Sequence, residues 1–321
     1  MIGSQQESIG DSSNHRLLAI LGPTASGKSS LAISIALQVG GEIVNCDAMQ
    51  MTRFLCIGTA KPTHKERSLV PHHLFDIISP DESYSAGDYM EDARRVCREI
   101  ARRQKLPIVV GGSGLYLRVL LEGIFEGPGK SNELRFRLKK ICKRKGCPHL
   151  HKMLMRKDPD AAGRIQQNDL TRVIRALEVV FMTGRKLSEL QRNRKALEGF
   201  RVLKIGINVP REDLYDRINR RVERMFQSGG LLEEVETVLG MGYLSSSKGF
   251  KALGYRYAVS ILNGEMTRDQ AIELTQRDTR RYAKRQLTWF RREPDVVWLT
   301  GPGEDPAATI EAMKLLEGLG G

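Results

Sequence analysis

The sequence predicts an α/β protein of the P-loop NTPase-like class, in which helices flank a parallel sheet and a helical insertion domain interrupts the chain. Three observations support this fold class. Short apolar runs alternate with longer helix-like stretches, a glycine-rich motif follows the first run, and the strand signals vanish over one basic central segment. Such alternation is typical of a parallel sheet covered by helices.

The predicted strands are six short apolar runs. They cover residues 17–21, 43–46, 74–78, 108–110, 203–209 and 296–299. Gly or Pro stands at several joins between these runs and the helix-like stretches, as is usual where strands and helices meet. Runs that are apolar throughout, without alternation, indicate strands buried on both faces, so we expect a parallel sheet.

The helical insertion is predicted from residue 127 to residue 199. Its expected helices cover residues 132–145, 149–157, 170–183 and 187–194. The core domain then consists of residues 15–126 and 200–321, and residues 1–14 form a polar tail that we expect to be flexible. Residues 212–293 are rich in helix, and the last helix of this stretch begins at Thr267, which forms a capping-box pattern with Gln270.

The positive charge of the chain is concentrated in the insertion. Residues 130–157 contain eleven Lys or Arg and one acid, Glu133, a local net charge of +10 against +13 for all 321 residues. A basic helical face is often only a solvated surface. A concentration of this size, however, favours a polyanionic partner such as RNA or DNA.

Cysteine content and hydropathy indicate the compartment. The five cysteines form an odd, unpatterned set, which indicates reduced thiols in the cytosol. The first fifteen residues lack the apolar segment of a signal peptide, and no stretch is long and apolar enough to span a membrane. We therefore expect a cytoplasmic protein that does not associate with membranes. Separately, we expect a monomer.

A complete phosphate-binding motif, GPTASGKS, follows the first predicted strand and precedes a helix. Its residues are Gly22, Pro23, Thr24, Ala25, Ser26, Gly27, Lys28 and Ser29. Glycines let backbone N–H groups converge on phosphate oxygens, Lys28 reaches the terminal phosphate, and the Ser29 hydroxyl can bind Mg²⁺. The motif alone would suggest ATP binding, but a kinase, a motor ATPase and a transferase with a diphosphate leaving group could all use it.

Asp47 is the acidic residue expected beside this loop. Motor ATPases and GTPases place an Asp after a later strand to help hold magnesium, whereas here the strand 108–110 runs into glycines. The second predicted strand ends near Asp47, and carboxyl ends of parallel strands gather beside the P-loop. From its position alone, Asp47 could equally cap a helix or contact the ligands of magnesium.

Nine segments together resemble one family, the tRNA dimethylallyltransferases, also called tRNA isopentenyltransferases. They are GPTASGKS at 22–29, NCDAMQ at 45–50, IGTAKP at 57–62, VPHHL at 70–74, YSA at 84–86, VGGSGLYL at 110–117, RALEV at 175–179, LGYR at 253–256 and YAKRQLTWFR at 282–291. The resemblance extends over about residues 17–293, and the order of the segments makes it specific.

The resemblance implies transfer of a dimethylallyl group from its diphosphate to N6 of the adenosine on the 3′ side of the anticodon, position 37, in tRNAs that read codons beginning with U. The products would be N6-dimethylallyladenosine and diphosphate, and ATP would not be consumed. Asp47 matches the family's general base. Lys28 and a magnesium ion on Ser29 would stabilise the leaving group, and Arg221 matches a family arginine near the diphosphate, although its sequence context alone favours a solvated helical arginine.

The resemblance also implies a set of residues that contact the anticodon stem-loop of tRNA. They are Asp47, Ala48, Met49, Gln50, Ser113, Arg135, Thr171, Arg172, Val173, Ile174, Arg175, Lys251, Ala252, Leu253, Gly254, Tyr255 and Arg256. A loop base read in this way is extruded into a pocket, while positive side chains hold the flanking phosphates.

The chain departs from the family at two positions near Asp47. Ala48 and Thr52 stand where many members carry Ser and Tyr, which removes a hydroxyl and a ring from the region of base contact. The spacing of a zinc motif is not found in Cys142, Cys147, His149 and His151.

The competing hypotheses for the function are a free-nucleotide isopentenyltransferase, a small-molecule P-loop kinase and a non-catalytic RNA-binding protein.

Overall fold

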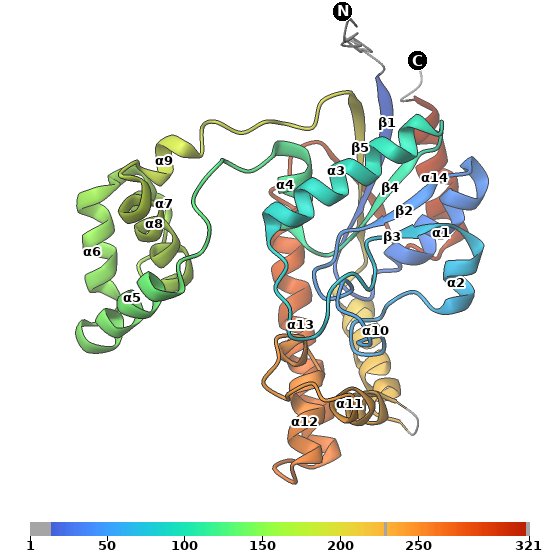
Figure 1. Cartoon of the computed structure of the whole chain (residues 1–321). Helices are drawn as coiled ribbons and strands as arrows, with labels where there is room; N and C mark the ends of the chain where they lie inside the picture. Colours follow the sequence, from blue (N-terminus) through green and yellow to red (C-terminus); the bar gives the residue numbers. More distant parts are fainter. Residues whose placement is uncertain (1–13, 228–229, 319–321) are drawn as a thin grey trace, which may run out of the picture. The chain divides into compact units, whose positions relative to one another are not determined.

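The computed structural model describes residues 14–227 and 230–318 (Figure 1). The tail predicted to be flexible, residues 1–14, lies outside the described residues except for its last position. Clustering of contacts divides the chain into two compact units, residues 121–196 and the remainder. The division falls a few residues before the start and the end of the predicted insertion.

The core unit contains one six-stranded sheet in the order β3-β2-β4-β1-β5-β6, and all its strand pairs are parallel. The strands are β1 (His15–Leu21), β2 (Glu42–Asn45), β3 (His72–His73), β4 (Pro107–Gly111), β5 (Phe200–Asn208) and β6 (Val296–Thr300). A parallel sheet flanked by helices is the predicted fold class, which the structure confirms.

The third predicted strand was wrong in position. Residues 74–78 do not form a strand, because Leu74 and Asp76 have positive φ angles of 62° and 55° and the chain turns there. The strand lies just before them, at His72–His73, and Ile78 forms only an isolated bridge with Thr52. A strand of two residues is too short to give a periodic signal.

Helices lie on both faces of the sheet: α1 (Lys28–Val39) and α14 (Pro306–Glu317) pack together on one face, and α3 (Ala86–Arg102) contacts the other. The other helices of the core unit are α2 (His64–Leu69), α4 (Gly114–Glu122), α10 (Arg211–Met225), α11 (Leu231–Gly240), the 3₁₀ helix Gly249–Lys251, α12 (Tyr255–Leu262) and α13 (Arg268–Phe290). Leu18 and Ile20 of β1 join the hydrophobic cluster that contains Leu31 of α1. Because side chains alternate along a strand, Leu17 and Ala19, which are equally buried, face the side of α3.

The insertion unit is wholly helical. Its helices are α5 (Asn132–Lys145), α6 (Cys147–Lys157), α7 (Pro159–Arg164), α8 (Leu170–Thr183) and α9 (Leu187–Leu190). They share their own core, in which Leu138, Leu150, Leu154 and Leu177 are buried. The bounds predicted for α5 and α8 agree with the structure, while α6 begins two residues earlier than predicted, α9 ends four residues earlier, and α7 was not predicted.

Buried carboxylates organise the insertion. Asp158 accepts hydrogen bonds from the Ala161 amide (3.0 Å), the Ser188 amide (2.9 Å) and the Ser188 hydroxyl (2.6 Å). These bonds join α7 to α9. Glu178 holds a second cluster that involves two residues predicted to contact tRNA, and it is described with the site.

Candidate active site

The predicted P-loop connects β1 to α1, as the motif requires. Its turn needs left-handed backbone at Ala25 (φ 65°) and Gly27 (φ 86°). Glycine adopts this conformation without strain. A Cβ at Gly27 would also lie 2.7 Å from the Gly303 amide nitrogen. The loop therefore fits only because a residue without a side chain occupies position 27.

Lys28 lies inside this loop and folds back onto it. Its Nζ donates a hydrogen bond to the Pro23 carbonyl oxygen at 2.6 Å. Burial lowers the pKa of Lys28 to about 8, because desolvation disfavours the charged amine; the nearby Asp47 opposes this shift and Arg221 adds to it. A positive charge held in such surroundings is stabilised by an anionic ligand.

Asp47 lies just after β2, beside the loop. The Asn45 side chain fixes this segment: its Oδ1 accepts from the Asp47 amide (2.9 Å) and its Nδ2 donates to the Asp47 carbonyl (3.1 Å). The Met49 amide donates to Asp47 Oδ1 at 3.0 Å. Burial raises the pKa of the Asp47 carboxyl against the opposing effects of these amides and of Lys28, so the carboxylate is a stronger base than usual.

Arg221 is not the solvated helical arginine that its sequence context favours. It projects from α10 to the P-loop, where its Nη2 donates to the Thr24 hydroxyl at 2.7 Å. Burial lowers its pKa to about 10, and its Nε is buried without a hydrogen-bond partner in the described residues. The helical pattern could not reveal this burial, since it depends on α10 packing beside a loop almost 200 residues away.

Gln286, on α13, is a residue of the site that sequence reasoning missed. Its Oε1 accepts from the Thr24 amide at 2.8 Å and its Nε2 donates to the Gly112 carbonyl at 3.0 Å. The side chain is buried, with 5% of its surface exposed. The only signal in the sequence is its place inside the segment 282–291, one of those that resemble the family.

Two cavities of the core unit meet at these residues. One, of about 160 Å³, is lined by the P-loop, Asp47, Gln50, Arg221 and Gln286. The other, of about 320 Å³, shares Thr24, Asp47, Thr59 and Arg221 with it. Further residues line this second cavity: Ala48, Met49, Gly58, Ser113, Met225, Lys251, Ala252, Leu253, Thr275, Thr279, Tyr282 and Arg285. Asp47 therefore belongs to the walls of both a phosphate-type cavity and a more apolar one.

The structure brings together most of the core residues predicted to contact tRNA. Ala48, Met49, Ser113 and the stretch 251–253 line the second cavity, and the Ser113 hydroxyl accepts from the Ala48 amide at 3.1 Å. Asp47 and Gln50 line the first cavity.

The rest of the predicted core set lies differently. Tyr255 is fully buried, and its hydroxyl donates to Glu234 at 2.5 Å and accepts from the Gly58 amide at 3.0 Å. Gly254 is the left-handed residue before α12, and Arg256 forms an ion pair with Asp278. Gly254, Tyr255 and Arg256 are therefore not among the residues that line the second cavity.

In the insertion, two of the predicted arginines are bound to Glu178. Arg135 donates from Nε (2.8 Å) and Nη2 (2.8 Å), Arg175 donates from Nη1 (2.7 Å), and the Ser131 amide donates at 2.8 Å. Burial alone would raise the pKa of Glu178, but these hydrogen bonds outweigh it and lower the pKa to about 2. Val173 and Ile174 are buried, whereas Thr171 and Arg172 are exposed.

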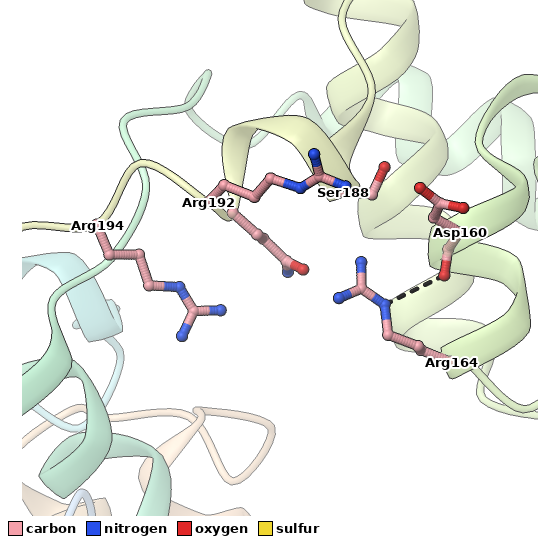
Figure 2. Close-up of a pocket in the computed structure, with 6 residues that line it drawn as sticks. Asp160, Arg164, Ser188, Arg192 and Arg194 are labelled. Carbon is pink, nitrogen blue, oxygen red and sulfur yellow. Dashed lines mark hydrogen bonds between the residues drawn. The ribbon is translucent and has the colours of Figure 1, made fainter.

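The insertion also contains a pocket of its own, of about 390 Å³. It is lined by Asp160, Arg164, Ser188, Gln191, Arg192 and Arg194. Figure 2 shows the side chains of Arg164 and Arg192 directed into the space between α7 and the segment that follows α9. Arg164 Nε donates to the Asp160 carbonyl at 3.1 Å. None of these residues was predicted from the sequence to bind a ligand.

The cysteines differ from expectation at one place. Cys142 and Cys147 form a disulfide between the end of α5 and the start of α6, although all five thiols were predicted to be reduced. Spacing had argued against zinc there, and no cluster of three potential metal ligands occurs in residues 14–227 and 230–318. In the same ranges, no helix is long and apolar enough to cross a membrane.

Fold and site together define a class: a P-loop protein whose phosphate-binding loop adjoins a half-buried carboxylate and a second, partly apolar cavity. A family model described as IPP transferase matches residues 50–293, and one described as isopentenyl transferase matches residues 15–72. The chain belongs to the IPP transferase family, which confirms the resemblance seen in its motifs.

Similar proteins carry consistent names. The tRNA dimethylallyltransferase of Koribacter versatilis is 51% identical over 302 residues, which cover 94% of this chain and 98% of that protein. The tRNA dimethylallyltransferase of Geobacter sulfurreducens is 47% identical over 303 residues, covering 94% and 97%. A crystal structure of the tRNA isopentenylpyrophosphate transferase of Bacillus halodurans aligns with a TM-score of 0.70 at 36% identity, covering 95% of this chain and 97% of that one.

A structure of a eukaryotic dimethylallyltransferase acting on tRNA aligns with a TM-score of 0.78 at 26% identity, covering 95% of this chain and 79% of that one. The chain is therefore a transferase, and its fold is that of solved enzymes of the same family.

Proposed function

We propose that this protein transfers a dimethylallyl group from dimethylallyl diphosphate to N6 of the adenosine at position 37 of tRNA, in tRNAs that read codons beginning with U. The products are N6-dimethylallyladenosine and diphosphate. The observation that carries the proposal is the place of Asp47, whose carboxylate lines both the P-loop cavity and the adjoining apolar cavity. Relatives that match nearly the full chain are named for this reaction.

The adenine amine is a weak nucleophile, because its lone pair is delocalised into the ring. A carboxylate that removes its proton as the C–N bond forms speeds the reaction, and the raised pKa of Asp47 suits that role. When the allylic C–O bond breaks, negative charge collects on the leaving diphosphate. Lys28 of the loop and Arg221 beside it stabilise that charge.

A magnesium ion fits the loop as part of this proposal. Mg²⁺ in proteins usually takes one or two protein oxygens and completes its shell with phosphate oxygens and water. Ser29 supplies a hydroxyl in the same cavity wall as Asp47. When bound, the ion supplies further positive charge to the leaving group.

The insertion is proposed to hold the anticodon stem-loop. Its exposed positive charges support this role: α5 ends with Lys143, Arg144 and Lys145, and the insertion pocket offers Arg164 and Arg192. Phosphate contacts of this kind supply most of the affinity of a protein for RNA and make it depend on salt. We also propose that the enzyme is cytoplasmic and monomeric.

The proposal is tested by incubating the full chain with Mg²⁺, dimethylallyl diphosphate and unmodified tRNA, and by analysing the digested RNA for N6-modified adenosine. In a parallel reaction, AMP replaces tRNA as the acceptor. In a third reaction, ATP replaces dimethylallyl diphosphate as the donor and the acceptor is unlabelled. Modified adenosine in the tRNA reaction alone supports the proposal. Modified AMP would indicate a free-nucleotide isopentenyltransferase, ATP consumption a kinase, and tRNA binding without any product a non-catalytic RNA-binding protein.

A further inference from the structure

We infer that Gln286 is a positioning residue, which sets the geometry of the diphosphate-binding loop relative to the strand end that carries the base. The inference rests on the proposed function, because it concerns the same site. It goes beyond that function, since Gln286 acts on the loop backbone and has no proposed contact with reacting atoms.

The burial of Gln286 is the first step. Polar groups are buried in proteins almost only where hydrogen bonds compensate for the loss of water. Gln286 lies on the face of α13 that also carries the buried residues Thr275, Thr279 and Ala283, and both ends of its amide are used. The oxygen accepts from Thr24 (2.8 Å) and the nitrogen donates to Gly112 (3.0 Å). One primary amide thus joins two separate loops.

The two loops serve different parts of the proposed reaction: one binds the diphosphate and the other positions the base. Thr24 begins the turn of the P-loop, and its hydroxyl is held by Arg221. Gly112 precedes Ser113, whose amide donates to the Cys46 carbonyl (3.1 Å) and whose hydroxyl accepts from the Ala48 amide (3.1 Å). Cys46 and Ala48 flank Asp47. The Gln286 bridge therefore connects the diphosphate side of the site with the base side.

Steric fit supports the same conclusion. A Cβ on Gly112 would lie 2.0 Å from Gln286 Nε2 and 3.5 Å from Asp47 Oδ2. A Cβ on Gly114 would lie 2.1 Å from the Trp289 ring, one turn further along α13. The two glycines thus allow α13 to approach the strand end closely enough for the amide to reach both loops.

The Gln286 bridge also determines which amides of the P-loop are free to bind a ligand. Because the Thr24 N–H points to Gln286, it is not available to a phosphate oxygen, and the anion must be bound by the amides closer to α1. An isosteric carboxylate at this position would keep the acceptor for Thr24, lose the donor to Gly112 and add negative charge beside the diphosphate. An apolar leucine would lose both hydrogen bonds.

The test compares full-length Q286L and Q286E with a matched control, Q276L. Gln276 lies on the same helix, and its Nε2 donates to the Asn219 carbonyl (3.4 Å) and to Glu223 (3.1 Å), both on α10. For each protein, KM and kcat are measured with dimethylallyl diphosphate varied at saturating tRNA. Binding of inorganic diphosphate with Mg²⁺ is measured by calorimetry in the absence of tRNA.

We expect Q286L to raise both the KM for dimethylallyl diphosphate and the Kd for diphosphate by about tenfold, the effect of one or two lost hydrogen bonds. The KM for tRNA should change less than about threefold. Q286E should bind diphosphate more weakly than Q286L at pH 8, and its affinity relative to that of the unmodified chain at the same pH should recover as the pH falls, because the protonated carboxyl can donate to Gly112. Q276L should retain the affinity of the unmodified chain.

Equal diphosphate affinity in Q286L and Q276L, or a loss of thermal stability without any change in KM, would overturn the inference. If Q286L does not fold, Q286E decides the question through its pH dependence. The calorimetric measurement does not require turnover. Absence of modified tRNA with intact diphosphate binding would therefore count against the proposed function, whereas unchanged diphosphate binding in Q286L would count against the positioning role.

Discussion

Two clusters of positive charge, one in each unit of this protein, differ in whether a carboxylate is paired with them. In the core, Lys28 and Arg221 form no ion pair with a carboxylate in the described part of the chain, and burial lowers their pKa values to about 8 and about 10. In the insertion, Arg135 and Arg175 both bind Glu178, whose pKa falls to about 2. Lys28 and Arg221 therefore have no anionic partner among the described residues until a diphosphate binds, whereas Arg135 and Arg175 are already paired with Glu178.

This difference separates charge that serves a ligand from charge that serves the fold. A buried cation without a partner costs stability and gains most when an anion arrives, whereas a buried ion pair is costly to break. Arg135 and Arg175 were predicted to contact tRNA, but most of their hydrogen bonds go to Glu178 and Pro128. Contact with RNA by the insertion should therefore depend more on its exposed basic residues.

The largest effect is expected from Asp47→Asn, which removes the base but keeps the shape of the site. Turnover should fall by about 10² to 10⁴, the usual contribution of a general base. Affinity for tRNA should remain close to that of the unmodified chain, which filter binding can measure. A rate that does not change would remove Asp47 from the mechanism and leave it a structural residue after β2.

Arg221→Met tests the role of the unpaired cations in the core unit. Removal of a transition-state donor typically costs about 10² to 10³ in rate, so kcat/KM for dimethylallyl diphosphate should fall by that factor. Thermal stability should stay equal or rise, because an unpaired buried charge is removed. A marked drop in Tm would mean that Arg221 holds the loop together and that the contrast between the units is wrong.

Glu178→Gln tests the insertion half. Loss of the carboxylate leaves two arginines without their partner, and unfolding free energy should fall by about 3 kcal/mol. Hydrogen exchange in residues 121–196 would locate the loss. The matched control is Glu133→Gln, an exposed i,i+4 partner of Arg137, which should change stability by less than about 0.5 kcal/mol.

The same carboxylate predicts a dependence of stability on pH. Its pKa in the folded protein, about 2, lies below the ordinary value of 4.5, so its stabilising effect is complete above pH 4.5. The effect is lost as the pH falls from 4.5 towards 2. Acid unfolding of Glu178→Gln should be correspondingly less steep, and identical acid transitions in the two proteins would contradict the ion-pair argument.

The smallest effect is expected for the exposed basic residues of the insertion. Replacing Lys139, Lys143 and Lys145 by Gln should reduce the slope of log K for tRNA binding against log salt by about two to three, because each phosphate contact contributes about 0.7 to 0.9. Replacing Arg164 and Arg192 in a second protein assigns the remaining contacts. An unaltered slope in both would place the RNA on other surfaces of the chain.

Much of this site could be predicted from the sequence. The position of Asp47 beside the P-loop followed from the rule that parallel strands present their carboxyl ends together. The bounds of α5 and α8 were predictable as well, since Ser131 and Asp169 each accept a hydrogen bond at the N-terminus of their helix. These features depend on residues close together in the chain.

Features that depend on distant residues were not predictable in this way. The burial of Arg221, the bridge made by Gln286 and the cluster around Glu178 each require two or more elements to pack first. No helix was predicted after residue 293, although α14 packs beside α1. A helical pattern describes one face of one element and carries no information about the loop it will meet.

The Gln286 bridge has a consequence for synthesis on the ribosome. Thr24 and Gln286 are separated by 262 positions, so the diphosphate loop is made long before its partner. At 5 to 20 residues per second, roughly 13 to 50 s pass between them. During that time the nascent chain carries a glycine-rich loop without its final geometry, and the capacity to capture the prenyl donor arises only after Gln286 has been made.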